Sequence, residues 1–204
     1  MSLTCDISRT AIDASVPEAG ALEDDPGVLV AGGGCFWCTE AVFRELKGVL
    51  SVDSGYAGGS ADTADYQSVC SGATDHAEVI RITYDPAEIP MGELLRIFFT
   101  VAHDPTQLNR QGADRGTQYR SVLFYQSDAL RDYMADYISR LNDSGVFSQP
   151  VVTTVEPLDA FYAAEAYHQD YAANNPGQPY IAYNTAPKIA KLHKAFGDKV
   201  GEES

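Results

Sequence analysis

Segments with strand-like and helix-like hydrophobic spacing alternate along almost the whole chain. In residues 77–84, "AEVIRITY", apolar and polar side chains alternate with the period of two that is typical of a β-strand. In residues 91–102, apolar residues recur every three or four positions, as on one face of an α-helix. Further strands are predicted in residues 27–34, 49–60, 119–126 and 151–157, and further helices after Cys35 and in residues 130–141, 162–171 and 188–196. We therefore expect one β-sheet with helices packed against it, and short connections between some strands favour a mixed sheet.

A polar segment, residues 103–118 ("HDPTQLNRQGADRGTQ"), interrupts this alternation. It is rich in turn-forming residues and too long to be a plain connection between two elements. Loops of this kind often carry functional residues, so the segment is a candidate part of a site.

The length of 204 residues is sufficient for one domain with a substantial core. Residues 1–27 lack apolar periodicity and carry six carboxylates against a single arginine. We predict a mobile acidic leader there and a single catalytic domain over residues 28–204. The leader has neither the basic start nor the apolar stretch of a secretory signal. We therefore expect a cytoplasmic protein, in a reducing compartment where a structural disulfide is disfavoured.

The formal net charge of -15 argues against one large class of partner. Nucleic acids are bound through clustered lysine and arginine, so we expect no nucleic-acid partner. No apolar run reaches membrane-spanning length, and we expect no membrane partner. The chain is expected to be a monomer.

Two of the four cysteines lie three residues apart, where glycines separate a predicted strand from a predicted helix. The N–H groups at a helix N-terminus are unpaired and partly positive, so they are expected to lower the pKa of Cys35 and favour its thiolate. Cys38 follows one helical turn later, within disulfide range. Cys35 is thus a candidate nucleophile, and Cys38 a thiol that could resolve its oxidised form. Phe36 and Trp37 are adjacent in sequence and point in different directions, so at least one is expected at the mouth of the site.

Two other interpretations of this cysteine pair remain open on spacing alone. One is a zinc site with Cys35, Cys38, Cys70 and His76 as ligands, although structural zinc sites usually bring two such cysteine pairs. The other is a general disulfide oxidoreductase, although the residues between its cysteines are usually small or rigid rather than aromatic.

Glu78 falls on the apolar face of the predicted strand 77–84, together with Ile80 and Ile82. A carboxyl group in apolar surroundings has a raised pKa, and it can then act as a general acid near neutral pH. The alternative is that Glu78 lies at the strand end and its carboxylate reaches solvent.

Five segments carry a more specific signal when they are taken in order along the chain. They are "GCFWCTE", "GYAGG", "YQSVCSGATDHAEV", "HDPTQLNRQGADRGTQYRS" and "EPLDAFYAAEAYHQDY". Together they resemble the A-type peptide methionine sulfoxide reductases, and the likeness covers about residues 28–196. The resemblance implies an α+β fold: a two-layer sandwich with a mixed β-sheet flanked by helices around a ferredoxin-like core. It implies reduction of the S epimer of methionine sulfoxide, free or in oxidised proteins, with no metal and no organic cofactor.

The resemblance also implies roles for individual residues. Cys35 matches the nucleophile that attacks the sulfoxide sulfur, and Glu78 matches the acid that protonates the oxygen. The other matches are to substrate-binding residues: Phe36 and Trp37 to the pocket for the methyl group, Tyr66 and Tyr119 to phenols that hydrogen-bond the oxygen, and Asp114 to an acidic loop residue that helps to arrange the site.

The chain departs from the common pattern of this family at its second cysteine. Many members have glycine in place of Cys38 and carry resolving cysteines near the C-terminus, whereas here no cysteine follows Cys70. The chain is similar to the subset with "GCFWC". The resemblance and the one-turn spacing both favour Cys38 as the thiol that converts a Cys35 sulfenic acid to a disulfide, which thioredoxin would reduce. Cys70 is predicted to be a small buried residue, and Cys5 lies in the leader.

Three polar residues near these motifs are given lesser roles. Asp75 stands where the family commonly has glycine, and an inward-pointing carboxylate there would raise the pKa of Glu78 further. His76 and His168 are predicted to be structural residues that form hydrogen bonds.

Overall fold

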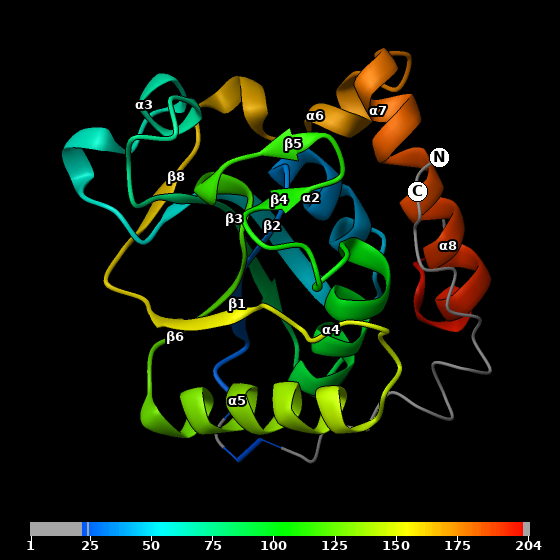
Figure 1. Ribbon diagram of the computed structural model, residues 1–204. Helices are drawn as coiled ribbons and strands as arrows, with labels where there is room; N and C mark the ends of the chain where they lie inside the picture. Colours follow the sequence, from blue (N-terminus) through cyan, green and yellow to red (C-terminus); the bar gives the residue numbers. More distant parts are fainter. Residues whose placement is uncertain (1–21, 24, 202–204) are drawn as a thin grey trace.

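The computed structural model describes residues 22–23 and 25–201, and a six-stranded sheet forms its centre (Figure 1). In spatial order the strands are β7 (Thr154–Pro157), β6 (Ser121–Tyr125), β1 (Val28–Gly33), β3 (Ala77–Tyr84), β2 (Val49–Ala57) and β8 (Phe161–Ala163). β6 and β7 run parallel, and the other neighbouring strands run antiparallel. The sheet is therefore mixed, as the short connections predict.

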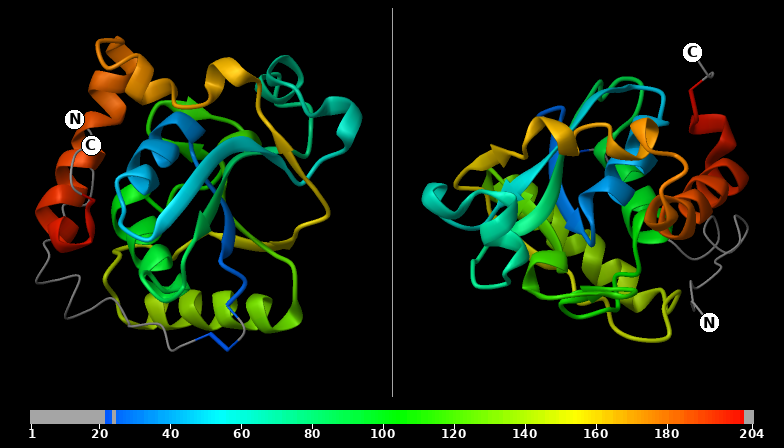
Figure 2. Two further views of the ribbon diagram at one scale, coloured as in Figure 1. Left: turned by 180° about the vertical axis from the view of Figure 1, so that it is seen from behind. Right: turned by 90° about the horizontal axis from the view of Figure 1, so that it is seen from above.

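The helices are mostly short, and the hydrophobic faces predicted from the sequence are the faces that they bury. They are α2 (Phe36–Arg44), α3 (Tyr66–Cys70), α4 (Met91–Ile97), α5 (Asp128–Asp143), α6 (Tyr171–Asn174), α7 (Pro179–Asn184) and α8 (Ala186–Phe196). α4 continues directly into a π-helical turn, Phe98–Ala102. α7 and α8 form one side of the molecule, and α5 lies at the end opposite α3 and α6 (Figures 1 and 2).

The two faces of the sheet bury unequal amounts of apolar surface. The larger cluster joins Ile80 and Ile82 of β3 to side chains of α2, α4, α5 and α8. The smaller cluster, on the other face, contains Val79, Val122 and Phe124. Alternate residues of β3 belong to opposite clusters, as the period of two requires. The result is an α+β architecture with its helices concentrated on one face.

The helix predicted around residues 162–171 is not formed. The chain there makes β8, then a 3₁₀ turn, Ala166–His168, and only then begins α6. β8 extends the sheet at the edge of β2. The Gln169 side-chain amide accepts a hydrogen bond from Ser54 N–H in β2 and donates one to the Ser54 carbonyl. Pairing with an open strand edge outweighs the local helical spacing.

The polar segment 103–118 is a structured loop with a small hairpin of its own. The hairpin pairs β4 (Arg110–Gln111) with β5 (Asp114–Arg115), and a 3₁₀ turn, Thr117–Tyr119, leads from it into β6. The loop begins at buried His103, whose Nδ1 donates a hydrogen bond to the Phe98 carbonyl and whose Nε2 is hydrogen-bonded to the Ser121 hydroxyl. These anchors hold the loop against the end of the sheet.

The predicted leader is described only near its end, because residues 1–21 lie outside the described residues. Asp25 accepts hydrogen bonds from the Tyr84 hydroxyl, from Gly27 N–H and from Met91 N–H at the start of α4. None of the helices in the part of the chain that the structure describes is both long and apolar enough to cross a membrane.

Candidate active site

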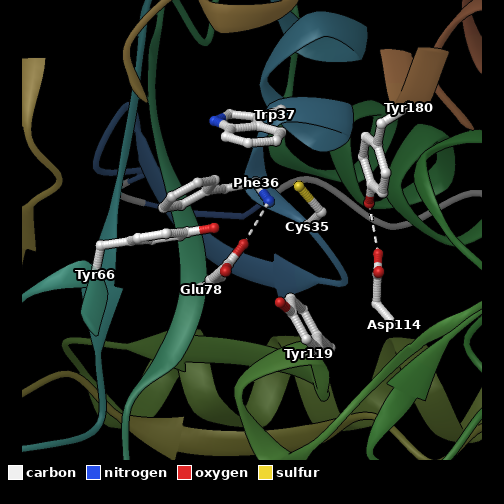
Figure 3. Close-up of a pocket in the computed structure, with 8 residues that line it drawn as sticks. All are labelled: Cys35, Phe36, Trp37, Tyr66, Glu78, Asp114, Tyr119 and Tyr180. Atoms are coloured by element: carbon white, nitrogen blue, oxygen red, sulfur yellow. Dashed lines mark hydrogen bonds between the residues drawn. The ribbon is translucent and has the colours of Figure 1, made fainter. Parts of the chain in front are cut away.

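Cys35 lies at the junction between β1 and α2, in the N-cap position of the helix. The preceding residue, Gly34, has a φ of +87°, and a Cβ atom there would come within 2.6 Å of the Gln111 Cβ. Only glycine fits this position, since it is both left-handed and in contact with the 103–118 loop. The tight turn points the Cys35 sulfur into a cavity of about 200 Å³ (Figure 3).

Seven of the residues selected from the sequence line this cavity. They are Cys35, Phe36, Trp37, Tyr66, Glu78, Asp114 and Tyr119. They come from α2, α3, β3, β5 and the turn before β6, so the sheet and its loops bring together positions up to 84 residues apart in the chain. The eighth lining residue, Tyr180 of α7, was not selected from the sequence. Cys38 lies behind the cavity rather than in its wall.

Glu78 is buried, with 2% of its surface exposed, and the alternative in which its carboxylate reaches solvent is wrong. Its Oε2 atom accepts a hydrogen bond from Phe36 N–H at 3.1 Å. Burial raises the pKa of Glu78 to about 8, and the negative charges of Asp114 and Cys38 act in the same direction. The carboxyl group is therefore largely protonated at neutral pH and able to donate a proton. Asp75, the candidate for raising this pKa, is exposed and takes no part.

The two aromatic residues after Cys35 both line the cavity, although they are adjacent in sequence. Phe36 is fully buried and forms its inner wall, whereas Trp37 is partly exposed. The Trp37 indole N–H donates to Nδ1 of His168 at 3.1 Å, and its ring stacks on Tyr171 with 3.9 Å between centroids. Residues from the C-terminal part of the chain thus fix the position of the Trp37 side chain in the cavity wall. His168 forms a hydrogen bond as predicted, but its partner belongs to the cavity.

Tyr66 and Tyr119 approach the carboxyl group of Glu78 from two sides, each with its hydroxyl directed into the cavity (Figure 3). Burial raises the pKa of both phenols, and the charge of Glu78 adds to the shift. Both remain protonated at neutral pH, so both are hydrogen-bond donors. Tyr66 is held at the start of α3, where its N–H donates to Glu165 at 3.0 Å.

Tyr180 closes the remaining side of the cavity, and its hydroxyl donates to Oδ2 of Asp114 (Figure 3). Its ring meets Trp37 edge-on. The Tyr180 hydroxyl is also near both thiols and has a small lowering effect on the pKa values of Cys35 and Cys38. One signal in the sequence could have found it: Gln178 followed by Pro179 is a typical helix start, and Tyr180 is on the first turn.

The two thiols of the "CFWC" segment have opposite proton affinities. Burial, interaction with the Cys38 thiol and the charge of Glu78 together raise the pKa of Cys35 well above its usual value. Interaction with Cys35 lowers the pKa of Cys38 to about 6, helped by the charge of Lys188 and a hydrogen bond with Thr185. The prediction that the helix N-terminus would favour a Cys35 thiolate is therefore wrong. One reason is that Phe36 N–H, which could have stabilised the thiolate, donates to Glu78.

The residues proposed for the zinc alternative do not form a metal site. Within the described residues, no group of three or more histidine, cysteine, aspartate or glutamate side chains is arranged to hold a metal ion. His76 is buried elsewhere, with Nε2 at 2.9 Å from the Ser60 carbonyl oxygen. Cys70 is partly exposed at the end of α3, so the prediction that it is a small buried residue is wrong.

Comparison with known proteins gives one consistent result. Residues 28–200 match the family model described as peptide methionine sulfoxide reductase. A curated relative, the peptide methionine sulfoxide reductase MsrA of Deinococcus radiodurans, is 52% identical over 171 residues, covering 84% of this chain and 82% of the relative.

Solved structures agree. The crystal structure of Mxr1 from Saccharomyces cerevisiae in reduced form has a TM-score of 0.69 and 37% identity, over 76% of this chain and 90% of that one. Mxr1 in complex with Trx2 gives a TM-score of 0.50 and 28% identity, over 74% of this chain and 89% of that one.

Proposed function

The chain belongs to the peptide methionine sulfoxide reductase family, and on that premise we propose how its site carries out the reaction. The protein is an oxidoreductase that reduces methionine sulfoxide to methionine and depends on thioredoxin. Within that reaction we assign the nucleophile to Cys35, the acid to Glu78 and the resolving thiol to Cys38. We propose the S epimer of methionine sulfoxide, free or in oxidised proteins, as the substrate.

The observation that carries the assignment is the buried, protonated carboxyl group of Glu78 in the same cavity as the Cys35 sulfur. A sulfoxide is a poor electrophile until its oxygen is protonated or firmly hydrogen-bonded. Glu78 can supply the proton, and the hydroxyls of Tyr66 and Tyr119 can stabilise the oxygen as charge develops on it.

In the first chemical step, side chains of the cavity and Cys38 supply and accept all the protons that move. Cys35 transfers its proton to the neighbouring Cys38 thiolate and attacks the sulfoxide sulfur as a thiolate. Glu78 gives its proton to the oxygen, which passes to the Cys35 sulfur. Methionine leaves, Cys35 becomes a sulfenic acid and Glu78 becomes a carboxylate.

The second step uses the protonated Cys38 thiol. Its sulfur attacks the sulfur of the Cys35 sulfenic acid, a disulfide forms and water is released. Glu78 regains its proton from solvent. Two electrons from thioredoxin then restore both thiols. No step requires a metal or an organic cofactor.

The walls of the cavity support selection of one epimer. A sulfoxide sulfur carries three different groups, and the cavity offers each a different surface: Phe36 and Trp37 for the methyl group, Glu78 and the two phenols for the oxygen, and the open mouth for the rest of the chain. Reversing the configuration at sulfur would exchange two of these groups. The wrong epimer would thus place oxygen on an aromatic face.

The proposal also includes the fold of the core, the oligomeric state and the location of the protein. The order β6-β1-β3-β2, with antiparallel pairing and with α2 and α4 as crossovers, supports a ferredoxin-like core. A monomer is consistent with a cavity lined by one chain. A cytoplasmic location fits a cycle whose thiols must be reduced after each turnover.

A reductant-free experiment tests the proposal directly. Fully reduced protein is mixed with methionine S-sulfoxide, released methionine is quantified, and disulfides are mapped by peptide mass. We expect about one methionine per chain, a Cys35–Cys38 bond, and no methionine from the R epimer. Unreacted sulfoxide with unchanged thiols would contradict the assignment. A general disulfide oxidoreductase would give that result while still reducing protein disulfides, whether or not Glu78 is intact.

A further inference from the structure

We propose that thioredoxin attacks the sulfur of Cys35, and that Cys38 leaves as a thiolate held by Thr185 and Lys188 of the C-terminal helices. This inference rests on the proposed Cys35–Cys38 disulfide. It assigns a direction to the last step of the cycle and a positioning role to two residues outside the cavity.

Accessibility decides which sulfur can be attacked. Cys35 is partly exposed and opens into the cavity, where an incoming thiolate can line up with the disulfide. Cys38 is 3% exposed and is not part of the cavity wall. Its sulfur lies 3.2 Å from the Thr185 hydroxyl, which is itself only 2% exposed. Thiol–disulfide exchange requires access to the attacked sulfur, so Cys35 is the reachable end of the bond.

The surroundings of Cys38 are those of a stabilised anion. The hydroxyl of Thr185 can donate to a sulfur anion at the observed distance. Lys188 lies in the first turn of α8, is partly buried, and donates to the carbonyl of Ala102. It forms no ion pair with any carboxylate that the structure describes, so its charge acts on its surroundings uncompensated.

The groups around Cys38 lower its pKa, and burial opposes them. The Cys35 thiol lowers this pKa most, and Lys188, Thr185 and Tyr180 lower it further. Glu78 interacts with Cys38 across the cavity wall and is largely protonated at neutral pH. In the reduced protein this balance lowers the pKa of the Cys38 thiol to about 6. When Cys35 is bonded to another sulfur its thiol no longer contributes, and Lys188, Thr185 and Tyr180 are the groups that still stabilise the Cys38 thiolate. A thiol of low pKa is the better leaving group in disulfide exchange.

Reduction of the disulfide takes two successive thiol–disulfide exchanges. A thioredoxin thiolate forms a bond to the Cys35 sulfur, the Cys35–Cys38 bond breaks, and its electron pair stays on Cys38 as the thiolate. The second thioredoxin thiol then attacks the thioredoxin sulfur of the mixed disulfide and becomes part of the thioredoxin disulfide. Cys35 leaves and takes up the proton. Thioredoxin supplies both electrons.

A trapping experiment tests which sulfur is attacked. The protein is first oxidised with one equivalent of methionine S-sulfoxide, and the Cys35–Cys38 bond is verified by mass spectrometry. Unreacted sulfoxide would refute the proposed function, and methionine without that bond would refute Cys38 as the resolving thiol, both before the direction of attack is tested. The oxidised protein is then mixed with a thioredoxin whose second active-site cysteine is replaced by serine. The mixture is quenched in acid, free thiols are alkylated, and the adduct is located by fragment masses.

We expect the adduct on Cys35, with Cys38 alkylated. An adduct on Cys38, with Cys35 alkylated, would overturn the direction of attack.

The roles of Lys188 and Thr185 are tested by the rate at which the preformed disulfide oxidises thioredoxin. Lys188→Met and Thr185→Val are each expected to slow this step, Lys188→Met by about tenfold, because Cys38 becomes a poorer leaving group. Lys188→Arg keeps the charge and is expected to react at nearly the original rate. Lys194→Met, which removes the charge of an exposed lysine on the same helix, is the matched control and is expected to change nothing.

A titration separates this role from a structural one. In a Cys35→Ser background, alkylation of Cys38 is followed by mass against pH. Its midpoint is expected to rise in Lys188→Met and to return in Lys188→Arg. Equal midpoints and equal rates in all three lysine variants would refute the role of the charge, and circular dichroism establishes that each variant is folded.

Discussion

The carboxyl group of Glu78 accepts a hydrogen bond from the backbone N–H of Phe36, 3.1 Å away, at the first turn of α2. The bond ties the acid of β3 to the residue that follows Cys35. An N–H donor by itself favours the ionised carboxylate and lowers the pKa. Burial has the larger effect, and the pKa rises to about 8. The geometry therefore fixes the carboxyl group in place without removing its proton.

Replacing Glu78 by glutamine is expected to slow methionine formation by about 10²- to 10⁴-fold, the usual contribution of a general acid. Glutamine has the same shape and can still accept a hydrogen bond from Phe36 N–H. The decrease in rate therefore measures the contribution of the Glu78 proton alone. Single-turnover release of methionine from methionine S-sulfoxide measures it. Turnover within a factor of two of the original would remove Glu78 from the mechanism.

The same Glu78→Gln change is expected to alter the pH dependence of stability. Because the folded-state pKa of about 8 lies above the ordinary value of 4.5 for a glutamate, the folded protein binds more protons than the unfolded chain between these pH values. Stability then falls as pH rises from about 4.5 to about 8. The variant lacks this loss and should gain about 4 kcal/mol over the original protein at pH 8, and almost nothing at pH 4.5.

Denaturant unfolding of both proteins at several pH values provides this comparison. The difference between the two curves is the relevant quantity, because Glu40, whose pKa burial raises to about 7, titrates in both proteins. A difference that does not change with pH would show that Glu78 is ionised in the folded state.

Tyr66→Phe and Tyr119→Phe each remove one hydroxyl directed at the sulfoxide oxygen. Each is expected to lower the single-turnover rate by about 10²-fold, as for the loss of one donor to a developing charge. The rings remain, so binding of the methyl group to Phe36 and Trp37 should change little. A variant that raises KM and leaves kcat intact would assign that phenol to substrate binding alone.

His168→Phe tests the support of the Trp37 wall. The change keeps a ring among the surrounding aromatics and removes the acceptor of the indole N–H. We expect KM to rise by about tenfold, in line with the cost of an unpaired polar group of roughly 1–2 kcal/mol. Tryptophan fluorescence reports the altered environment, since Trp37 is the single tryptophan of the chain. Unchanged fluorescence and KM would show that stacking on Tyr171 suffices.

Cys38→Ser separates the chemical step from resolution. The variant is expected to release about one methionine per chain and then to stop as a sulfenic acid when thioredoxin is the only reductant. A sulfenic-acid probe detected by mass identifies the stalled species. Cys70→Ser, which removes a partly exposed thiol outside the cavity wall, is the control and should retain thioredoxin-driven turnover. The reverse pattern would make Cys70 the resolving thiol.

Much of the sheet could be predicted because its strands carry their own signal. The alternation in residues 77–84 places Ile80 and Ile82 on the larger core, and with them Glu78. The helical face of residues 91–97 was equally clear, since apolar periodicity reflects burial directly. Residues 162–171 were predicted wrongly as a helix, because an edge strand takes its conformation from the neighbour with which it pairs.

The sequence by itself determined which groups could do chemistry: a thiol between a strand and a helix, a second thiol one turn on, and a carboxyl group on an apolar face. Tertiary structure alone decided where the protons lie. Burial raises the pKa of Cys35, and interaction with the Cys35 thiol lowers the pKa of Cys38, helped by Lys188 and Thr185 from a distant part of the chain. Proton affinity depends on burial and on charges a few ångströms away, and neither can be read from the spacing of residues along a chain.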